Sequence, residues 1–185
     1  MSDRNTLKRN LMIALFAALM AAGAYIRVPI GPVPIVLSTM FVIMAGAVLG
    51  PAAGSIATAV YLIMGAVGIP VFAGGSGPAV FAGPTGGYLI AYIPATFICG
   101  LISADTDSLK EGLPVRDITA VVAASLLLYA IGVPWLKWRL GIDWGKAFSI
   151  GMLPFLIGDA VKAAAVVAIR TALVKRAPEL LPNRS

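Results

Sequence analysis

Long apolar runs, interrupted by few charges, are the feature that most restricts how this chain can fold. Of its 185 residues, 59% are hydrophobic and 12% are charged, whereas soluble domains have about 45–50% apolar and about 25% charged residues. Water cannot accommodate this much apolar surface, and a helix crosses a bilayer with about 20 apolar residues. The sequence therefore predicts an all-α, polytopic membrane protein that forms a compact bundle of six transmembrane helices.

The apolar runs also predict where the helices lie. We expect helices at residues 10–27, 35–50, 52–68, 86–104, 117–134 and 154–174. Residues 1–185 then form a single membrane domain, with no segment long enough for a soluble catalytic domain. Gly and Ala occur throughout the runs, which indicates closely packed helices. Cys99 lies inside the fourth run, where we expect a small buried residue.

The positions of Lys and Arg predict the orientation of the helices in the membrane. With six spans, both ends of the chain share one side with the 105–116 connection. That side carries Arg4, Lys8, Arg9, Lys110, Arg116, Arg170, Lys175, Arg176 and Arg184. The other side carries Arg27, Lys137, Arg139 and Lys146. Because basic residues favour the cytoplasmic side, we expect the tails 1–9 and 175–185 in the cytoplasm. Basic residues at the ends of apolar runs give no reason to expect a nucleic-acid partner.

Two connections on the opposite side are unusual. Residues 28–34 are rich in proline, and residues 69–87 are almost uncharged and rich in glycine. Irregular backbone at membrane depth is tolerated only where protein or a cavity satisfies it. We therefore expect residues 69–87 to fold back onto the bundle as a lid over a ligand site.

The last apolar run contains an aspartate and a lysine, Asp159 and Lys162, three residues apart on one helical face. Ionisable groups inside an apolar span are costly and usually mark a substrate or ion path. The alternative is an internal ion pair that holds the helix in register. A lysine ammonium can bind a carboxylate, and an aspartate accepts hydrogen bonds from N–H groups. The pair suits a ligand with an acid at one end and an amide-like group at the other.

Two further patterns have alternative interpretations. Ala14, Ala18 and Ala22 form a flat strip, which either packs inside the bundle or contacts a helix of another protein. Three tryptophans occur in residues 135–144 and form either an interfacial belt or part of a cap over the ligand.

The residues that are missing argue against an enzyme. The chain has no histidine, which excludes Ser-His and Cys-His catalysis and histidine-ligated metals. Residues 141–147 lack the spacing and the Ser/Thr of a phosphate-binding loop. We expect no catalytic residues, no metal and no cofactor. Any energy for transport must come from a partner protein or an ion gradient.

Five motifs together resemble the BioY family, the biotin-specific substrate-binding (S) components of energy-coupling factor (ECF) transporters. They are Gly31-Pro-Val-Pro34, Ala45-Gly-x-x-Leu-Gly-Pro51, Gly68-Ile-Pro-Val-Phe-Ala-Gly-Gly-Ser76, Gly83-Pro-Thr-Gly-Gly-Tyr88 and Pro154-Phe-x-x-Gly-Asp-x-x-Lys162. The resemblance extends over residues 10–174. In one departure, Ser38 stands where family members often have glutamine.

The resemblance implies a protein of the bacterial inner membrane. It further implies capture of biotin from outside and its delivery inward with a membrane coupling subunit and ABC-type ATPases. It implies that the α-helical strip of Ala14, Ala18 and Ala22 contacts the coupling subunit. The ligand contacts that it implies are Asp159, Lys162, Tyr88, Ser38, Gly74, Gly75, Ser76, Gly86 and Gly87.

Other functions remain open from the sequence. The chain can be the binding component for another carboxylated vitamin, a stand-alone transporter, or a non-transporting packing subunit of a membrane complex. Packing alone would require neither the aspartate–lysine pair nor the long 69–87 connection. The sequence does not decide whether copies of the chain form a homo-oligomer.

Overall fold

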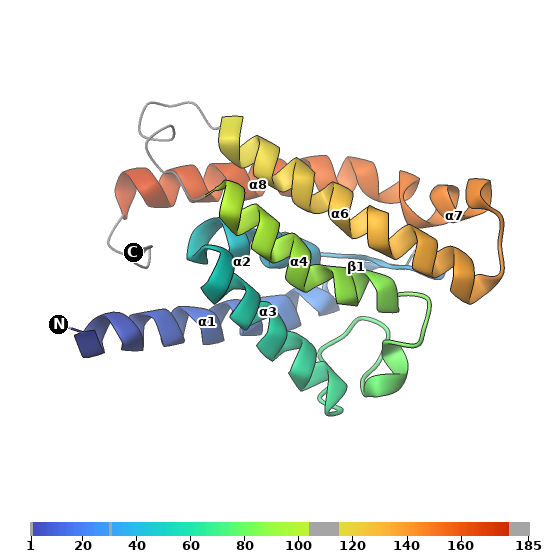
Figure 1. Cartoon of the computed structure of the whole chain (residues 1–185), viewed down its shortest axis with the longest axis horizontal. Coiled ribbons are helices and arrows are strands. Elements are labelled where there is room, and N and C mark those ends of the chain that lie inside the picture. Colours follow the sequence, from blue (N-terminus) through green and yellow to red (C-terminus); the bar gives the residue numbers. More distant parts are fainter. Residues whose placement is uncertain (1, 30, 104–114, 178–185) are drawn as a thin grey trace.

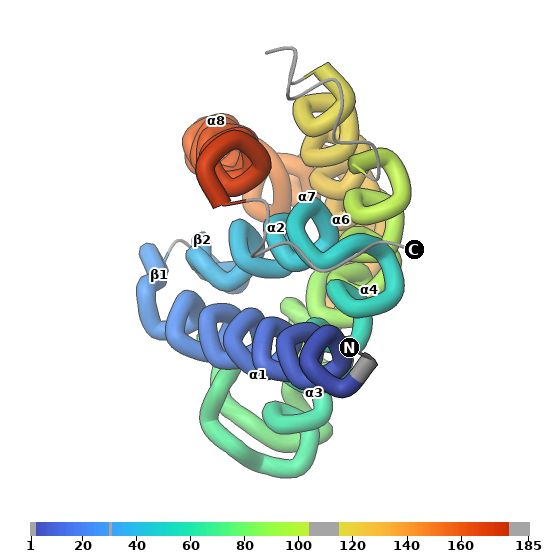
Figure 2. Tube along the Cα trace, turned by 90° about the vertical axis from the view of Figure 1, so that its left-hand side faces the viewer, coloured from blue at the N-terminus to red at the C-terminus, as the bar shows by residue number. Residues whose placement is uncertain are grey.

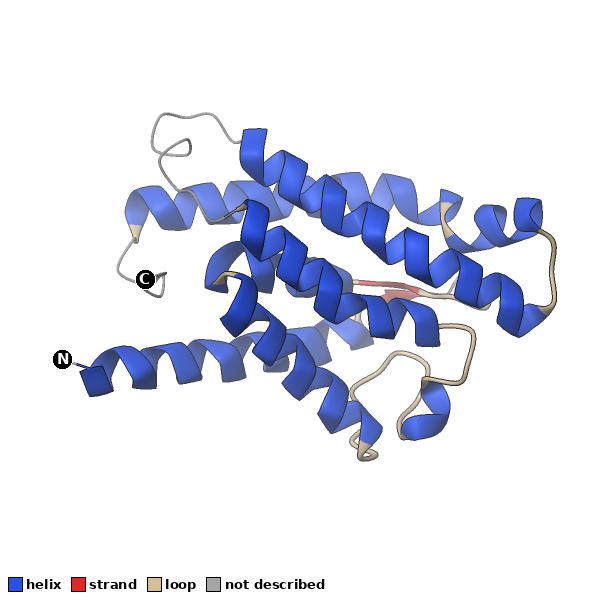
Figure 3. Cartoon of the chain, in the orientation of Figure 1, coloured by secondary structure: helices blue, strands red, loops and turns tan. Residues whose placement is uncertain are grey.

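The computed structural model describes residues 2–29, 31–103 and 115–177, and helices account for most of them (Figures 1 and 3). The helices are α1 (Ser2–Tyr25), α2 (Ser38–Leu49), α3 (Pro51–Ala66), η1 (Pro78–Val80), α4 (Gly86–Ile102), α6 (Val115–Leu140), α7 (Trp144–Gly151) and α8 (Leu153–Arg176). Two short strands, β1 (Arg27–Val28) and β2 (Ile35–Val36), pair antiparallel. The prediction of an all-α polytopic membrane fold is confirmed.

The six predicted helices are present but differ in length. Three segments are long and apolar enough to cross a membrane: Asp3–Tyr25, Val115–Leu140 and the combined segment Trp144–Arg176. The other three, α2, α3 and α4, are apolar but have 12, 16 and 17 residues. Of these, α2 contacts α1, α3, α4, α6 and α8, and it lies among the other helices in the end view of Figure 2.

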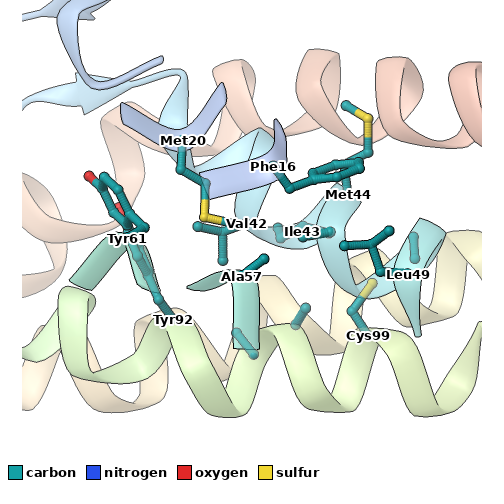
Figure 4. Packing of buried hydrophobic residues seen from close by; sticks show 14 of the residues in the cluster. Phe16, Met20, Val42, Ile43, Met44, Leu49, Ala57, Tyr61, Tyr92 and Cys99 are labelled. Carbon is teal, nitrogen blue, oxygen red and sulfur yellow. The ribbon is translucent and has the colours of Figure 1, made fainter. Parts of the chain in front are cut away.

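The core of the bundle forms around α2. Residues 42–49 of this helix are all buried, as expected for a helix that is hydrophobic on every side. Gly46 permits close contact with α4, because an added Cβ would lie 2.2 Å from the Thr96 carbonyl oxygen. In the packed cluster, Tyr61 and Tyr92 lie at one end, while Leu49 and Cys99 lie at the other (Figure 4). Cys99 is buried, as predicted.

The bundle has two distinct ends (Figure 1). The start of α1, the end of α8 and the α2–α3 turn lie together, and we call this the termini end. The β1–β2 hairpin, α7 and loop 3 (residues 67–85, between α3 and α4) lie at the opposite end, called the loop end. The described ends of the chain and the α2–α3 turn thus share one end of the bundle, as predicted, whereas placement of that end in the cytoplasm stays a prediction.

Two predicted boundaries were wrong. The first helix begins at Ser2, eight residues before the predicted start, so most of the predicted tail 1–9 is helical. These residues include no Pro or Gly that would end the helix. The fifth predicted helix continues through Pro134 to Leu140, because a membrane bundle tolerates a proline inside a helix.

The predicted 135–146 connection is consequently reduced to residues 141–143, and α7 follows as an additional helix. Asp143 caps α7, since its side chain accepts a hydrogen bond of 2.9 Å from the backbone N–H of Lys146. This bond lowers the pKa of the exposed Asp143 carboxyl below its ordinary value.

Arg170 was predicted among the basic residues on the cytoplasmic side, but it does not lie at the surface. Its side chain is fully buried, and it donates hydrogen bonds to the Asp117 carboxylate and to the backbone carbonyls of Ser103 and Ala47. It therefore holds α8 against α6, α4 and α2. The 104–114 connection with Lys110, and residues 178–185 of the C-terminal tail with Arg184, lie outside the described residues.

Candidate ligand-binding site

A cavity with an empty volume of about 910 Å³, including its open mouth, lies towards the loop end of the bundle. Side chains of α2, α3, α4, α6 and α8 form its walls, and residues 33–36 and loop 3 complete them. The lid predicted for residues 69–87 thus has the required position, although its opening and closing stay a prediction.

Tyrosines supply much of the cavity wall. Four of the five tyrosines in the chain line it, namely Tyr61, Tyr88, Tyr92 and Tyr129. Each offers an apolar ring and one hydroxyl group. Tyr61 and Tyr92 stack with their ring centroids 6.5 Å apart. The rings supply apolar surface, while the hydroxyls of Tyr61 and Tyr88 donate to the backbone carbonyls of Val71 and Gly151.

Asp159 and Lys162 form the charged part of the cavity, as their positions in an apolar run predicted. The Lys162 ammonium lies 3.2 Å from Asp159 Oδ1, and their side chains are 12% and 23% exposed respectively. Lys162 Nζ also donates to the Thr39 hydroxyl at 2.9 Å, and the Tyr129 hydroxyl donates to Asp159 Oδ2. The pair is thus an internal ion pair that also borders the cavity. Because the two charges cancel, it offers both a donor and an acceptor without a net charge.

Tyr129 and Thr39 were missed as members of this cluster. Their contacts with Asp159 and Lys162 join residues 30 and 123 positions apart in the chain, so no local spacing predicts them. The only sequence signal is a hydroxyl-bearing residue inside or beside an apolar run.

Loop 3 is packed against the bundle through Phe72. This side chain is 8% exposed, and its ring centroid lies 5.3 Å from that of Tyr61 and 5.6 Å from that of Phe81. Gly65 makes room for the ring, because a Cβ there would lie 2.0 Å from Phe72 Cζ. Further along the loop, the Trp135 indole donates a 2.9 Å hydrogen bond to the Gly83 carbonyl.

The predicted ligand residues fall into three groups. Asp159, Lys162, Tyr88, Ser38 and Gly74 line the cavity. Gly75 and Ser76 line a second, more open hollow at the outer side of loop 3.

The third group, Gly86 and Gly87, is buried in the first turn of α4 and does not line the cavity. Added Cβ atoms would lie 1.8 Å from the Phe81 carbonyl oxygen and 2.3 Å from Trp135 Cβ. These two glycines therefore allow close packing of loop 3 and α6 beside the site.

Ser38, which replaces the glutamine common in the resembled family, begins α2 and is 1% exposed. Its side chain interacts with the hydroxyl groups of Tyr61 and Tyr92. A role of Ser38 in ligand binding, acting through water in place of the glutamine, stays a prediction.

The alanines of α1 face two ways. Ala14, Ala18 and Ala22, the α1 strip, are exposed, whereas Ala17 is buried. The α1 strip therefore does not pack inside this bundle. A comparable exposed set on α8, the α8 strip, consists of Ala160, Ala164 and Ala168.

The tryptophans also differ from one another. Trp138 and Trp144 are 69% and 50% exposed, and they stack with Arg139 and Lys137 respectively. These two have the position of an interfacial belt, whereas Trp135 holds loop 3.

The comparison with known proteins identifies the family. The model of the BioY family matches residues 1–179. The chain belongs to the BioY family. A probable biotin transporter BioY of Pyrococcus horikoshii is 48% identical over 159 residues, which cover 85% of this chain and 91% of that protein. The biotin transporter BioY of Thermotoga maritima is 38% identical over 167 residues, which cover 89% and 95% of the two chains.

A solved structure of a transporter component has the same fold. The S-component for biotin from an ECF-type ABC transporter matches with a TM-score of 0.89 and 30% sequence identity. The match covers 99% of this chain and 100% of that one. The arrangement of the helices around the cavity is therefore that of a membrane transporter component.

Proposed function

We propose that this BioY chain binds biotin in the cavity and acts as the S component of an ECF-type vitamin transporter. The observation that carries the proposal is the neutral Asp159–Lys162 pair at the wall of a largely apolar cavity. Its relatives named as biotin transporters support the same ligand.

The chemistry of biotin fits the two parts of the cavity. Its ureido group has two N–H donors and one carbonyl acceptor. Asp159 accepts from N–H groups, and Lys162 donates to a carbonyl. A neutral ion pair suits this neutral polar group better than it suits a carboxylate. The apolar chain and the thiophane ring of biotin then pack against apolar side chains such as Leu128 and Phe155.

The position of the cavity suggests a route of transport. In our proposal the loop end faces outwards, so that biotin enters beside loop 3, and the termini end faces the cytoplasm. The α1 strip contacts the membrane coupling subunit, and the ABC-type ATPases of the complex hydrolyse ATP. The chain itself binds biotin without changing it chemically. The exposure of the α1 strip supports this assignment, because a partner helix can approach small side chains closely.

The test is equilibrium binding of labelled biotin to purified Asp159→Asn and Lys162→Ala proteins. Loss of one charge-assisted hydrogen bond costs about 1.5–3 kcal/mol, which corresponds to a roughly 10- to 150-fold weaker Kd. Lys175→Ala is the matched control, because Lys175 is exposed in the last turn of α8, away from the cavity. Wild-type affinity in a monodisperse Lys162→Ala protein would contradict the proposed site.

A competitor distinguishes biotin from another carboxylated vitamin. Lipoate has the same valerate chain but no ureido group, so it cannot satisfy the Asp159–Lys162 pair. We expect excess lipoate to leave biotin bound. Equal competition by lipoate would favour the alternative, a binding component for carboxylated vitamins in general. A pure packing subunit would bind neither compound.

A further inference from the structure

A second hollow lies beside the ligand cavity at the loop end. It is formed by the end of α1, the beginning of β1 and the 70–76 part of loop 3. Phe72, Ala73 and Gly74 line both this hollow and the ligand cavity. The two spaces are therefore separated only by this short stretch of loop 3.

Arg27 is the charged residue of this hollow, and two contacts place it next to the cavity. Its NH1 group donates a hydrogen bond to the backbone carbonyl of Ala73. Within the hairpin, Arg27 pairs directly with Val36, which lines the ligand cavity. Side chains of directly opposed residues extend from the same face of a two-stranded sheet. The guanidinium group is thus held at the border between the hollow and the cavity.

The other basic residues near the loop end have different partners or positions. Lys162 is neutralised by Asp159. Lys137 and Arg139 lie over the rings of Trp144 and Trp138, with distances of 5.1 and 5.6 Å to the ring centroids. Lys146 lies on α7 and lines neither space. Arg27 differs from these residues because it lines the second hollow. Among the described residues that line this hollow, none is acidic.

We infer that Arg27 recognises the carboxylate of the ligand whose neutral end occupies the Asp159–Lys162 pair. The inference rests on the proposed function, because it requires biotin in the cavity. The bond to Ala73 uses one of the five N–H donors of the guanidinium group, and a carboxylate can accept two parallel bonds from such a group. Ser76, which lines the same hollow, adds a hydroxyl donor. Arg27 thereby makes the protein selective for an anionic ligand and attracts it to the mouth.

The test compares biotin with biotinamide, which replaces the carboxylate by an uncharged amide and leaves the ureido end unchanged. Affinities of both compounds are measured for wild-type, Arg27→Gln and Arg27→Lys proteins at low salt. We expect the wild-type protein to prefer biotin by about fivefold to tenfold, and Arg27→Gln to remove most of that preference. Arg27→Lys keeps the charge but not the planar fork, so it retains part of the preference.

Arg27 also holds loop 3, and a control variant separates this effect from recognition of charge. The Tyr25 hydroxyl donates to the Pro70 carbonyl, so Tyr25→Phe loosens the same loop without removing a charge. We expect Tyr25→Phe to weaken both compounds equally and to keep the preference for biotin. An Arg27→Gln protein that loses affinity for both compounds by the same factor would overturn the inference. Failure of the wild-type protein to bind either compound would instead contradict the proposed function.

Discussion

The buried pair of Arg170 and Asp117 gives the sharpest prediction about stability. The two side chains are 0% and 2% exposed, and Arg170 additionally donates to the Ser103 and Ala47 carbonyls. Ala47 lies in the last turn of α2 and Ser103 directly follows α4, positions where the carbonyls have no further turn of their own helix to bond to. One cation therefore stabilises the ends of two helices and holds α8 to α6.

Arg170→Met leaves the Asp117 carboxylate buried without its charged partner. Removing one member of a buried pair costs about 3–5 kcal/mol. For a chain of this length, 1 kcal/mol lowers the Tm by about 2–4 °C, so the expected decrease is about 6–20 °C. Asp117→Asn should destabilise the protein similarly. The double variant should lose clearly less stability than the two single variants lose in sum, since it leaves no buried charge unpaired.

The assay is thermal unfolding of detergent-purified protein, followed by tryptophan fluorescence and gel filtration. Lys175→Met is the matched control, because Lys175 is an exposed cation one turn beyond Arg170 in α8, and its Tm should change little. Arg170 does not line the cavity, so the folded Arg170→Met protein should retain its affinity for biotin. Additive effects of the single substitutions, or a Tm within 2 °C of wild type, would refute the reasoning.

Three further predictions concern packing, the partner and loop 3. Gly87→Ala should lower the free energy of unfolding by about 1–3 kcal/mol, because the added Cβ would lie 2.3 Å from Trp135 Cβ. Gly74→Ala is the control: no atom lies within 4 Å of the added Cβ, so this variant should unfold at nearly the wild-type temperature. Leucines throughout the α1 strip should abolish co-purification with a coupling subunit while biotin binding persists, and leucines throughout the α8 strip should spare both. If the α1 variant instead stops binding biotin, the α1 strip supports the ligand-binding fold rather than contact with a partner. Biotin should slow hydrogen exchange in residues 69–87 but not in residues 2–9, and equal exchange with and without biotin would refute a lid.

The sequence was sufficient to predict the fold because the helices follow from apolar runs, which depend on local composition. Gly50 and Pro51, which separate the second run from the third, are likewise a local signal. It also predicted the Asp159–Lys162 pair, since an ionisable residue inside an apolar run has few explanations. Arg170, by contrast, lies near the end of an apolar run, where a basic residue usually fixes the orientation of the helix. Its buried partner is 53 residues away in the chain, and only the packing of α6 against α8 brings the two together.

Other parts of the site could not be predicted for related reasons. The family motifs identified Gly86 and Gly87 but not what they contact, and the structure places both against neighbouring segments rather than at the cavity. Tyr129 and Thr39 join the charged pair only through contacts between helices. Residues whose role depends on long-range packing carry no local signal in a single sequence.

If this chain forms a biotin site in its cavity, it must bind biotin without any partner subunit. The test is equilibrium dialysis of labelled biotin against the detergent-purified protein alone. We expect saturable binding that approaches one biotin per chain and is displaced by unlabelled biotin but not by lipoate. Monodisperse, folded protein that shows no saturable biotin binding would contradict it.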